Sequence, residues 1–258
     1  MNIIVCIKQV PNTTEVKTDP KTGTLIREGI PVIINPEDKV AIEAALQLKG
    51  KITVLSMGPP QAEDALREAL AMGTNKAILL CDVKFAGSDT WATANALAAI
   101  IKKLDYDLII CGRQAIDGDT AQVGPQLAEN LGLPQITYVQ KLDVKGNKIE
   151  SQRELEDGYE VVKANLPALI TVIQGLNNPR YPSLNGIDKA CKKEIKVLTA
   201  NDVKVNEKKV GLLSSPTKVK KVFSPPAKSP GIKLEGDIKT VCSNLVNILK
   251  EKEIIQEF

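Results

Sequence analysis

The sequence contains no histidine, few aromatic residues and a nearly balanced charge. Without an imidazole, the chain cannot form a Ser-His-Asp or Cys-His catalytic arrangement, nor a metal site that needs histidine ligands. Aromatic residues, at 3%, are too scarce for a platform on which nucleic-acid bases stack. A net charge of +3 is also too small for a dedicated nucleic-acid-binding protein. We therefore expect no nucleic-acid partner and no resident metal.

Cysteines and long apolar runs are sparse as well. The cysteines are five in number, lie far apart and form no C-x-x-C pair (Cys6, Cys81, Cys111, Cys191 and Cys242). This pattern indicates free thiols in a reducing compartment. The apolar run in the first residues, MNIIVCIKQVPN, is too short for a signal peptide, and no stretch of 18 uncharged apolar residues occurs. We expect a cytoplasmic protein that does not insert into a membrane.

The first half of the sequence alternates short apolar runs with segments of helical spacing. The apolar runs, rich in Ile, Val and Leu, cover residues 2–7, 52–57, 76–81 and 107–111. Runs of this length suit strands that are buried on both faces of a parallel sheet. The helical segments cover residues 36–50, 59–75, 88–104 and 120–132. This alternation predicts an α/β fold with a doubly wound, mostly parallel, Rossmann-like sheet.

The pattern changes after residue 135. Residues 136–155 and 158–175 alternate apolar and polar positions around glycine-containing turns, which predicts antiparallel strands added to the sheet. Beyond residue 176 clear periodicity is lost until an amphipathic helix near residues 236–252. We therefore divide the chain into an α/β domain, residues 1–190, and an extended C-terminal arm that ends in a helix, residues 191–258.

Much of this arm is basic. Residues 188–233 contain 12 Lys or Arg but only four Asp or Glu, which leaves the rest of the chain with a net charge of −5. A polar arm that ends in an amphipathic helix needs another surface on which the helix can lie, so the pattern favours a protein partner. The alternative is a solvated linker with a fraying helix.

The stretch GRQAIDGDTAQVGPQLAE, residues 112–129, lies where the last of the four apolar runs gives way to a helix. In a doubly wound sheet, ligands bind at this edge, beyond the carboxyl ends of the strands. Gly112 and Gly118 would let the backbone approach a ligand. The N–H groups of residues 120–124 would be the free donors of a helix start, and Pro125 costs nothing in the first turn.

The two aspartates of this stretch argue the other way. Asp117 and Asp119 would repel a phosphate that they faced, or would consume the free donors as helix caps. The stretch matches neither the Walker motif G-x-x-x-x-G-K-[ST] nor G-x-G-x-x-G. Local physical chemistry alone therefore leaves phosphate binding and simple capping open.

Three motifs in the sequence resemble those of a known family. GRQAIDGDTAQVGPQLAENLGLPQITYV (112–139) resembles its nucleotide-binding loop and helix. RELEDGYEVV (153–162) and LPALIT (166–171) resemble its signature of a basic residue, an acidic cluster, a proline and an apolar run, although Ser151 stands where Ala or Gly is usual. NNPRYPSLNGIDKACKK (177–193) resembles its partner-recognition loop, with Leu184 as the anchor. Over essentially its whole length, the sequence resembles the beta subunit of an electron transfer flavoprotein.

This resemblance implies a heterodimer with an alpha subunit that holds one FAD. The beta subunit of the family binds a second nucleotide, which is a structural AMP in conventional members. In electron-bifurcating members it is a second FAD that takes a hydride from NADH. One electron then passes to ferredoxin or flavodoxin, and the other passes through the alpha-subunit FAD to a partner dehydrogenase. That partner is an acyl-CoA dehydrogenase or a flavin-dependent hydroxy-acid dehydrogenase.

Two segments resemble the bifurcating branch. One is VPNTTEVKTDPKTGTLIREGIPVIINPEDKVAIEAAL, with Thr13 where conventional members tend to have tyrosine. The other is AGSDTWATANAL (86–97), whose Thr90 and Thr93 could reach the polar edge of a flavin. The alternatives are a conventional AMP-binding beta subunit and a nucleotide sensor of universal-stress type. A sensor needs neither the C-terminal arm nor the PRYPSL loop.

The family motifs also assign residues. The expected nucleotide contacts are Asn35, Asp38, Ser56, Met57, Gly58, Cys81, Asp82, Thr90, Thr93, Gly112, Arg113, Gln114, Asp117, Gly118, Asp119, Thr120, Ala121, Gln122, Val123, Gly124 and Pro125. The expected partner contacts are Arg180, Tyr181 and Leu184. No residue is expected to be catalytic, because the flavin carries the redox chemistry and the subunit is not an enzyme alone.

Some assignments have structural alternatives. Asn35 and Asp38 would bond the adenosine part of the nucleotide, or would cap the helix that begins there. Arg113 would stabilise a reduced flavin or pair with an acid, and Cys81 is equally suited to the core. Leu184 would anchor the partner or lie buried. The two acids of the 112–129 stretch should order the turn, so that backbone amides rather than carboxylates contact the phosphates.

Overall fold

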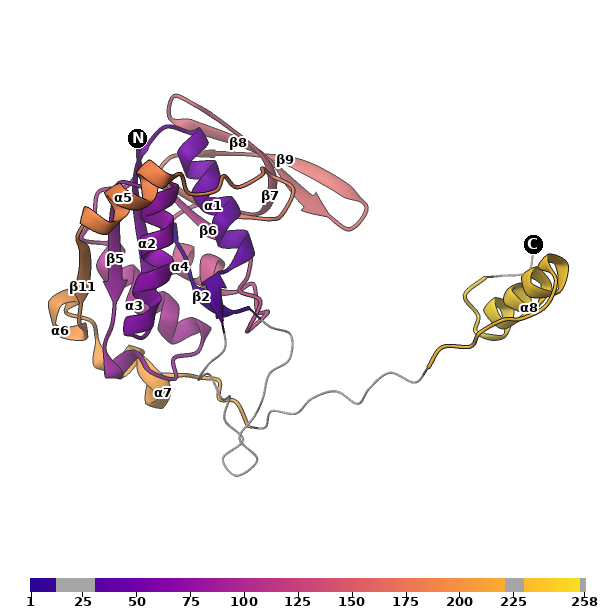
Figure 1. Ribbon diagram of the computed structural model, residues 1–258. Helices are drawn as coiled ribbons and strands as arrows, with labels where there is room; N and C mark the ends of the chain where they lie inside the picture. Colours follow the sequence, from indigo (N-terminus) through magenta and orange to yellow (C-terminus); the bar gives the residue numbers. More distant parts are fainter. Residues whose placement is uncertain (13–30, 221–229, 256–258) are drawn as a thin grey trace. The chain divides into compact units, whose positions relative to one another are not determined.

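The computed structural model describes residues 1–12, 31–220 and 230–255. The chain forms two compact units, Met1–Lys221 and Val222–Phe258. Figure 1 labels their helices and strands along the chain. The first unit contains the α/β domain, and the second contains one helix, α8 (Ile238–Glu251), close to the range expected for it.

A nine-stranded sheet, counted over the described residues, forms the centre of the first unit, in the order β11-β5-β4-β1-β6-β10-β7-β8-β9. The four strands predicted from apolar runs are β1 (Asn2–Cys6), β4 (Lys51–Met57), β5 (Lys76–Leu80) and β6 (Leu108–Gly112). They pair in parallel, with Cys6 of β1 opposite Leu55 of β4 and Cys111 of β6. Parallel strands bring their carboxyl ends to one edge, so the loops after them meet there.

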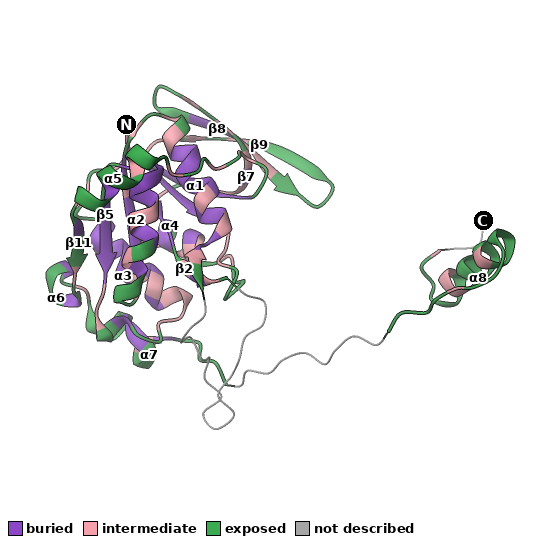
Figure 2. Cartoon of the chain, in the orientation of Figure 1, coloured by how far each residue is buried: buried purple, intermediate pink, exposed green. Residues whose placement is uncertain are grey.

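Helices cover both faces of this sheet. Helices α1 (Pro36–Gln47) and α2 (Glu63–Met72) pack on one face, and α3 (Thr90–Ile101) and α4 (Val123–Leu131) pack on the other. The sequence of β1 shows why, because Ile3 and Val5 join the first cluster and Ile4 and Cys6 join the second. Figure 2 shows much of the central strands and of the helices packed on them as buried. The doubly wound α/β fold is therefore confirmed.

Three long strands extend the sheet beyond β10. They are β7 (Gln135–Lys145), β8 (Lys148–Leu155) and β9 (Gly158–Asn165), and the pairs β7–β8 and β8–β9 are antiparallel, as predicted. The prediction is wrong for residues 168–172. They form β10 (Ala168–Val172), which pairs in parallel with β6 and β7. The run is buried at every position, as expected for a strand inside a parallel sheet.

The segment after residue 176 is more ordered than its sequence suggests. It contains α5 (Leu184–Lys192), β11 (Ile195–Leu198), α6 (Ala200–Val203), η3 (Glu207–Lys209) and α7 (Gly211–Ser214). Strand β11 pairs in parallel with β5 at the edge of the sheet. The first unit therefore continues to Lys221, beyond the boundary at residue 190 that we drew from the sequence.

Two short strands, β2 (Gln9–Pro11) and β3 (Val32–Ile34), form a small separate sheet just before α1. Single 3-10 turns precede the two helices that follow β4 and β5: η1 (Pro60–Ala62) and η2 (Val83–Phe85). Within the described ranges, none of the helices has the length and apolar character needed to cross a bilayer.

Candidate functional site

The loop between β6 and α4, residues 113–122, lies at the carboxyl edge of the sheet, as predicted. Asn35, immediately before α1, holds this loop through its side chain. Its Nδ2 donates to the Gln114 carbonyl oxygen at 2.8 Å, and its Oδ1 accepts from the Ile116 N–H at 3.1 Å. The side chain makes no helix-capping bond. The capping alternative for Asn35 is therefore wrong.

Asp38 joins the ends of two strands. Its Oδ2 accepts from the Lys8 N–H at 2.7 Å, and its Oδ1 accepts from the Gly112 N–H at 3.1 Å. The residue is 6% exposed. Burial raises the pKa of this carboxyl to about 7, against the opposing effect of the hydrogen bond from Lys8. Asp38 thus connects the backbone that follows β1 to the end of β6, instead of capping α1.

Glu37 and Arg113 form a second brace between α1 and the loop. Glu37 Oε2 accepts from the Gln114 N–H at 2.9 Å, and Glu37 Oε1 pairs with the Arg113 guanidinium at 2.9 Å. Burial raises the pKa of Glu37, although its hydrogen bond with Gln114 works in the opposite direction. The guanidinium carbon also lies 5.6 Å from the centre of the Tyr138 ring. Of the two roles considered for Arg113, pairing with an acid is the one observed.

The two acids of the loop bond other side chains and do not cap α4. Asp117 pairs with the Lys8 ammonium at 2.7 Å, and Asp119 accepts a hydrogen bond from Gln114 Nε2. Helix α4 begins at Val123, three residues later than predicted, and no side chain in the described part of the chain caps it. The capping interpretation is therefore wrong for both acids. Their expected role of ordering the turn fits these bonds.

The later start of α4 changes the place of its neighbours. Thr120 and Ala121 precede the helix, and Gln122 occupies the N-cap position. Asp119 and Ala121 adopt φ angles of +51° and +52°, in the left-handed region, where the chain turns toward the helix. The amides at the helix start are therefore those of Val123 and Gly124, with Pro125 in the first turn as predicted.

The glycines of the stretch serve different purposes. A Cβ at Gly112 would collide with the Asp38 carboxylate and with Glu37, so this glycine permits close packing of β6 against α1. A Cβ at Gly124 would lie 2.5 Å from Thr171 Cγ2, so that glycine permits close packing of α4 against β10. Gly118 has no other atom within 4 Å of such a Cβ among the described residues, as expected for a position that faces open space.

The residues after β4 and β5 line the same edge. Ser56 is buried, and its hydroxyl has no hydrogen-bond partner among the described residues. Met57 ends β4, and the Gly58 N–H donates to the Leu80 carbonyl oxygen at 3.0 Å. Cys81 is half-buried against the first core cluster, and its N–H donates to the Leu198 carbonyl oxygen at 2.9 Å.

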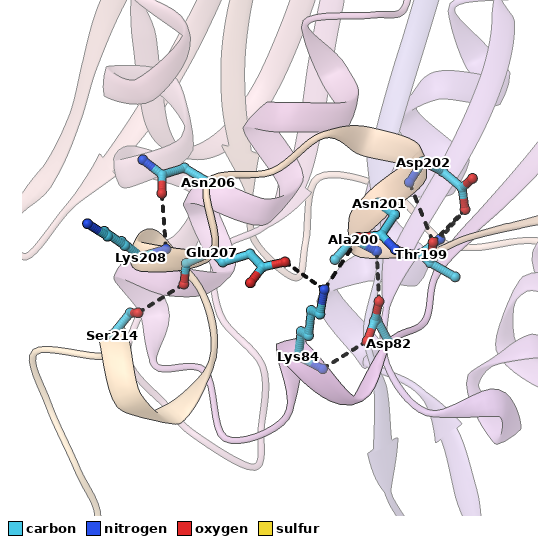
Figure 3. Close-up of polar contacts among 10 residues, drawn as sticks. All are labelled: Asp82, Lys84, Thr199, Ala200, Asn201, Asp202, Asn206, Glu207, Lys208 and Ser214. Atoms are coloured by element: carbon cyan, nitrogen blue, oxygen red, sulfur yellow. Dashed lines mark hydrogen bonds and ion pairs between the residues drawn. The ribbon is translucent and has the colours of Figure 1, made fainter.

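Asp82 faces the C-terminal segment (Figure 3). Its carboxylate accepts from the Lys84 N–H at 3.0 Å and from the Ala200 N–H at 2.9 Å. Backbone hydrogen bonds, that of Lys84 first, lower its pKa. Lys84 in turn donates to Glu207 at 2.6 Å. Asp82 therefore ties β5 to the start of α6, and both carboxylate oxygens are engaged.

Helix α3 approaches the loop through its first turn. Asp89 caps the helix by accepting from the Ala92 N–H at 2.9 Å, and it also accepts from the Thr217 N–H and hydroxyl. Thr90 Oγ1 donates to Gln122 Oε1 at 3.0 Å, which joins α3 to the residue before α4. Thr93 is half-buried one turn further along.

Sequence reasoning missed the braces that hold this site. Lys8 and Glu37 bond the 113–122 loop, and Asp89 bonds Thr217, yet none of the three was among the expected contacts. For Lys8 the signal was its place two residues after the end of β1. For Glu37 it was an acid in the first turn of a helix whose next turn is apolar.

The second candidate region is the segment between β10 and α5. Tyr181 is 93% exposed and Leu184, the first residue of α5, is 88% exposed, so Leu184 is not buried in the core of this unit. Arg180 points the other way and pairs with Glu43 of α1. A cleft of about 420 Å³ lies beside the segment, between residues of α1, α2 and the 174–182 stretch.

Comparison with known proteins identifies the family. Residues 22–203 match the electron transfer flavoprotein domain. The chain is 55% identical to the electron transfer flavoprotein subunit beta of Thermoanaerobacterium thermosaccharolyticum, over 99% of this chain and 100% of the relative. The chain belongs to the electron transfer flavoprotein family, as a beta subunit. The resemblance seen in the three sequence motifs is confirmed, and a sensor of universal-stress type is not supported.

Two further relatives have names that mention a reaction. One is the caffeyl-CoA reductase-Etf complex subunit CarD of Acetobacterium woodii, 50% identical over 99% of this chain and 100% of the relative. The other is the acryloyl-CoA reductase electron transfer subunit gamma of Anaerotignum propionicum, 45% identical over 99% of this chain and 100% of the relative.

Proposed function

We propose that this beta subunit binds a second FAD, accepts electrons from NADH and divides them between two acceptors. Ferredoxin or flavodoxin receives one electron, and a partner dehydrogenase receives the other through the FAD of the alpha subunit. The observation that carries the proposal is the uncapped start of α4 beside a loop whose acids are already bonded elsewhere. A helix start of this kind favours an anion such as a pyrophosphate.

The residues present fit a nucleotide. The buried Ser56 hydroxyl has no partner in the described part of the chain, so it offers a donor and an acceptor at the end of β4. Gly118 leaves open space at the turn, and the Val123 and Gly124 amides lie at the helix start. Asn35, Glu37 and Asp38 fix the loop and the end of β6 through hydrogen bonds.

The protein's part is positioning and electrostatics. A bound flavin would supply the hydride and electron chemistry. The α4 amides would hold its phosphates, and Thr90 and Thr93 of α3 would lie toward its polar edge. Arg113, which is already paired with Glu37, would add positive charge at the site. No side chain needs to act as an acid, base or nucleophile.

The alternative is a structural AMP, which would use the same phosphate donors. Two segments support FAD by their resemblance to bifurcating members. One of them contains Thr13, which lies outside the described residues. The other contains Thr90, whose bond to Gln122 places it beside the start of α4.

For the electron acceptor, we propose an acyl-CoA dehydrogenase rather than a hydroxy-acid dehydrogenase. The names of both reductase-complex relatives contain a 2-enoyl-CoA thioester, caffeyl-CoA in one and acryloyl-CoA in the other. We also propose that the second unit, with α8, packs on the alpha subunit. We further propose that the protein functions in the cytoplasm, which the free state of all five cysteines supports.

Nucleotide content tests the second FAD. Denaturing the purified alpha–beta complex and quantifying the released nucleotides should give two FAD per heterodimer. One FAD and one AMP would instead show a conventional member and contradict bifurcation. Release of ATP from a colourless complex would contradict both the second FAD and the structural AMP.

A leucine substitution tests whether the partner docks on residues 176–184, which we call the docking segment. Replacing Leu184 with alanine should lower electron delivery to an acyl-CoA dehydrogenase by about tenfold or more, because an apolar anchor at an interface contributes about 2 kcal/mol or more. The nucleotide content should stay unchanged. Leu213→Ala is the matched control, since Leu213 is 93% exposed on α7. Equal rates in both variants would refute docking through Leu184.

A further inference from the structure

We propose that Arg180 is a positioning residue, which fixes the docking segment through Glu43 of α1 instead of binding the partner directly. This inference rests on the proposed docking of a dehydrogenase at Tyr181 and Leu184. It separates two roles within one segment: Arg180 points into the domain, and the two apolar side chains that follow point out.

The bond network of Arg180 ends on a single carboxylate. Its Nε donates to Glu43 Oε2 at 2.7 Å, a terminal guanidinium nitrogen donates to Oε1 at 2.9 Å, and its backbone N–H donates to Oε2 at 3.2 Å. Gln47 Nε2 adds a bond to Oε1 at 3.1 Å. A two-pronged arginine–carboxylate pair has a fixed geometry, so it holds the backbone as well as the side chain.

Glu43 itself is inaccessible to a partner. The residue is 4% exposed, in the middle of α1, and its pKa is lowered chiefly by the hydrogen bond from Arg180. Without Arg180, a buried charge would lose its main partner, which is costly. The pair is therefore favoured by the burial of the acid, although the Arg180 side chain is half exposed.

Other bonds hold the segment on both sides of its exposed part. Before it, Asn177 Nδ2 donates to the Val40 carbonyl oxygen at 3.0 Å. At its C-terminal end, Ser183 caps α5 by accepting from the Gly186 N–H at 3.0 Å. Gly186 packs so closely on the Ala71 carbonyl of α2 that a Cβ would collide with it.

A second arginine fixes the far end of α5. Arg67 of α2 donates to the carbonyl oxygens of Ala190 and Lys193 at 2.7 and 2.6 Å. The exposed part, from Tyr181 to Leu184, is thus fixed at both ends to the helices α1 and α2. A segment that is ordered before binding loses less entropy when a partner binds. The Arg180–Glu43 pair should therefore raise the affinity for the partner dehydrogenase.

The test uses the whole alpha–beta complex with NADH as donor and ferredoxin as one acceptor. An acyl-CoA dehydrogenase is the partner, and crotonyl-CoA accepts two electrons from it, one from each of two NADH. Glu43→Gln keeps the size of the side chain but removes its charge, and Arg180→Ala removes the other partner. Both variants should raise the KM for the dehydrogenase by roughly tenfold and leave kcat and nucleotide content unchanged. The double variant should be no worse than the worse single one, and Arg180→Lys should recover part of the affinity.

The effect of Glu43→Gln decides between the roles, because this buried residue cannot touch a partner. An unchanged KM in Glu43→Gln, with a raised KM in Arg180→Ala, would overturn the proposal and show direct contact by Arg180. Hydrogen exchange of residues 176–184 in the free complex should become faster in both variants, and unchanged exchange would also overturn it. Failure of the wild-type complex to reduce the dehydrogenase would instead refute the proposed function.

Discussion

Replacing Asp38 with asparagine is expected to lower the free energy of unfolding by about 2–3 kcal/mol near pH 5. The wild-type side chain accepts one N–H from Lys8 and one from Gly112. At pH 5, below its folded-state pKa, Asp38 is a neutral carboxyl whose carbonyl and hydroxyl oxygens can each still accept. An asparagine has one accepting oxygen, so one of the two amides would face an NH₂ group. The ends of β1 and β6 would lose a common brace, and the 113–122 loop should become looser.

The penalty of Asp38→Asn should depend on pH. The folded-state pKa of Asp38 is raised from 3.8 to about 7, chiefly by burial. A raised pKa means that the folded protein binds the proton more tightly than the unfolded chain. Its contribution to stability is therefore fully present below pH 3.8 and is lost as the pH rises through about 7. Between pH 5 and pH 8 the difference between wild type and variant should shrink by about 2–3 kcal/mol.

Urea denaturation of the alpha–beta complex at one protein concentration measures this difference. Subtracting the variant from the wild type at each pH removes the contribution of other groups, including Glu37, whose pKa is raised as well. Asp105→Asn is the matched control, because Asp105 is exposed. A difference that stays constant from pH 5 to pH 8 would contradict a raised pKa at Asp38.

Local sequence patterns predicted most of the fold, because strands buried on both faces leave continuous apolar runs. They failed for a strand at the edge of the sheet and for the order of the strands within it. Strand β11 lies at the sheet edge, and two of its four residues are exposed, so no apolar run marked it. Residues 168–172 do form such a run, but the sequence cannot show that β10 enters the sheet between β6 and β7. That order depends on contacts between distant residues.

The candidate site shows the same limit. The sequence indicated which loop lies at the carboxyl edge, since that follows from the order of strands and helices. It could not indicate what each polar side chain bonds. Asn35 and Gln114 are 79 residues apart, and Arg180 and Glu43 are 137 apart. From the local sequence, Asp117 and Asp119 look like helix caps. Asp117 instead pairs with Lys8, beyond the end of β1, and Asp119 accepts a hydrogen bond from Gln114 within the loop.

Replacing Gly124 with alanine should move the start of α4 away from β10. The new Cβ would lie 2.5 Å from Thr171 Cγ2, and the Thr171 hydroxyl accepts from the Tyr138 N–H at 3.1 Å. Rotating the β-branched side chain away would break that bond. Overpacking of this kind costs about 1–3 kcal/mol, which outweighs the gain of up to about 1 kcal/mol from alanine in a helix. If α4 holds a pyrophosphate, the second nucleotide should also be lost more easily.

Thr171→Ser provides the decisive partner substitution, because it removes Cγ2 and keeps the hydroxyl. In the Gly124→Ala/Thr171→Ser variant, the clash is absent and alanine still favours the helix. The double variant should therefore recover both stability and nucleotide retention, with a coupling of about 1–3 kcal/mol between the two positions. Gly118→Ala, where a Cβ meets no other described atom within 4 Å, should leave the stability unchanged. Strictly additive effects would show that contact between α4 and β10 does not set the position of the helix start.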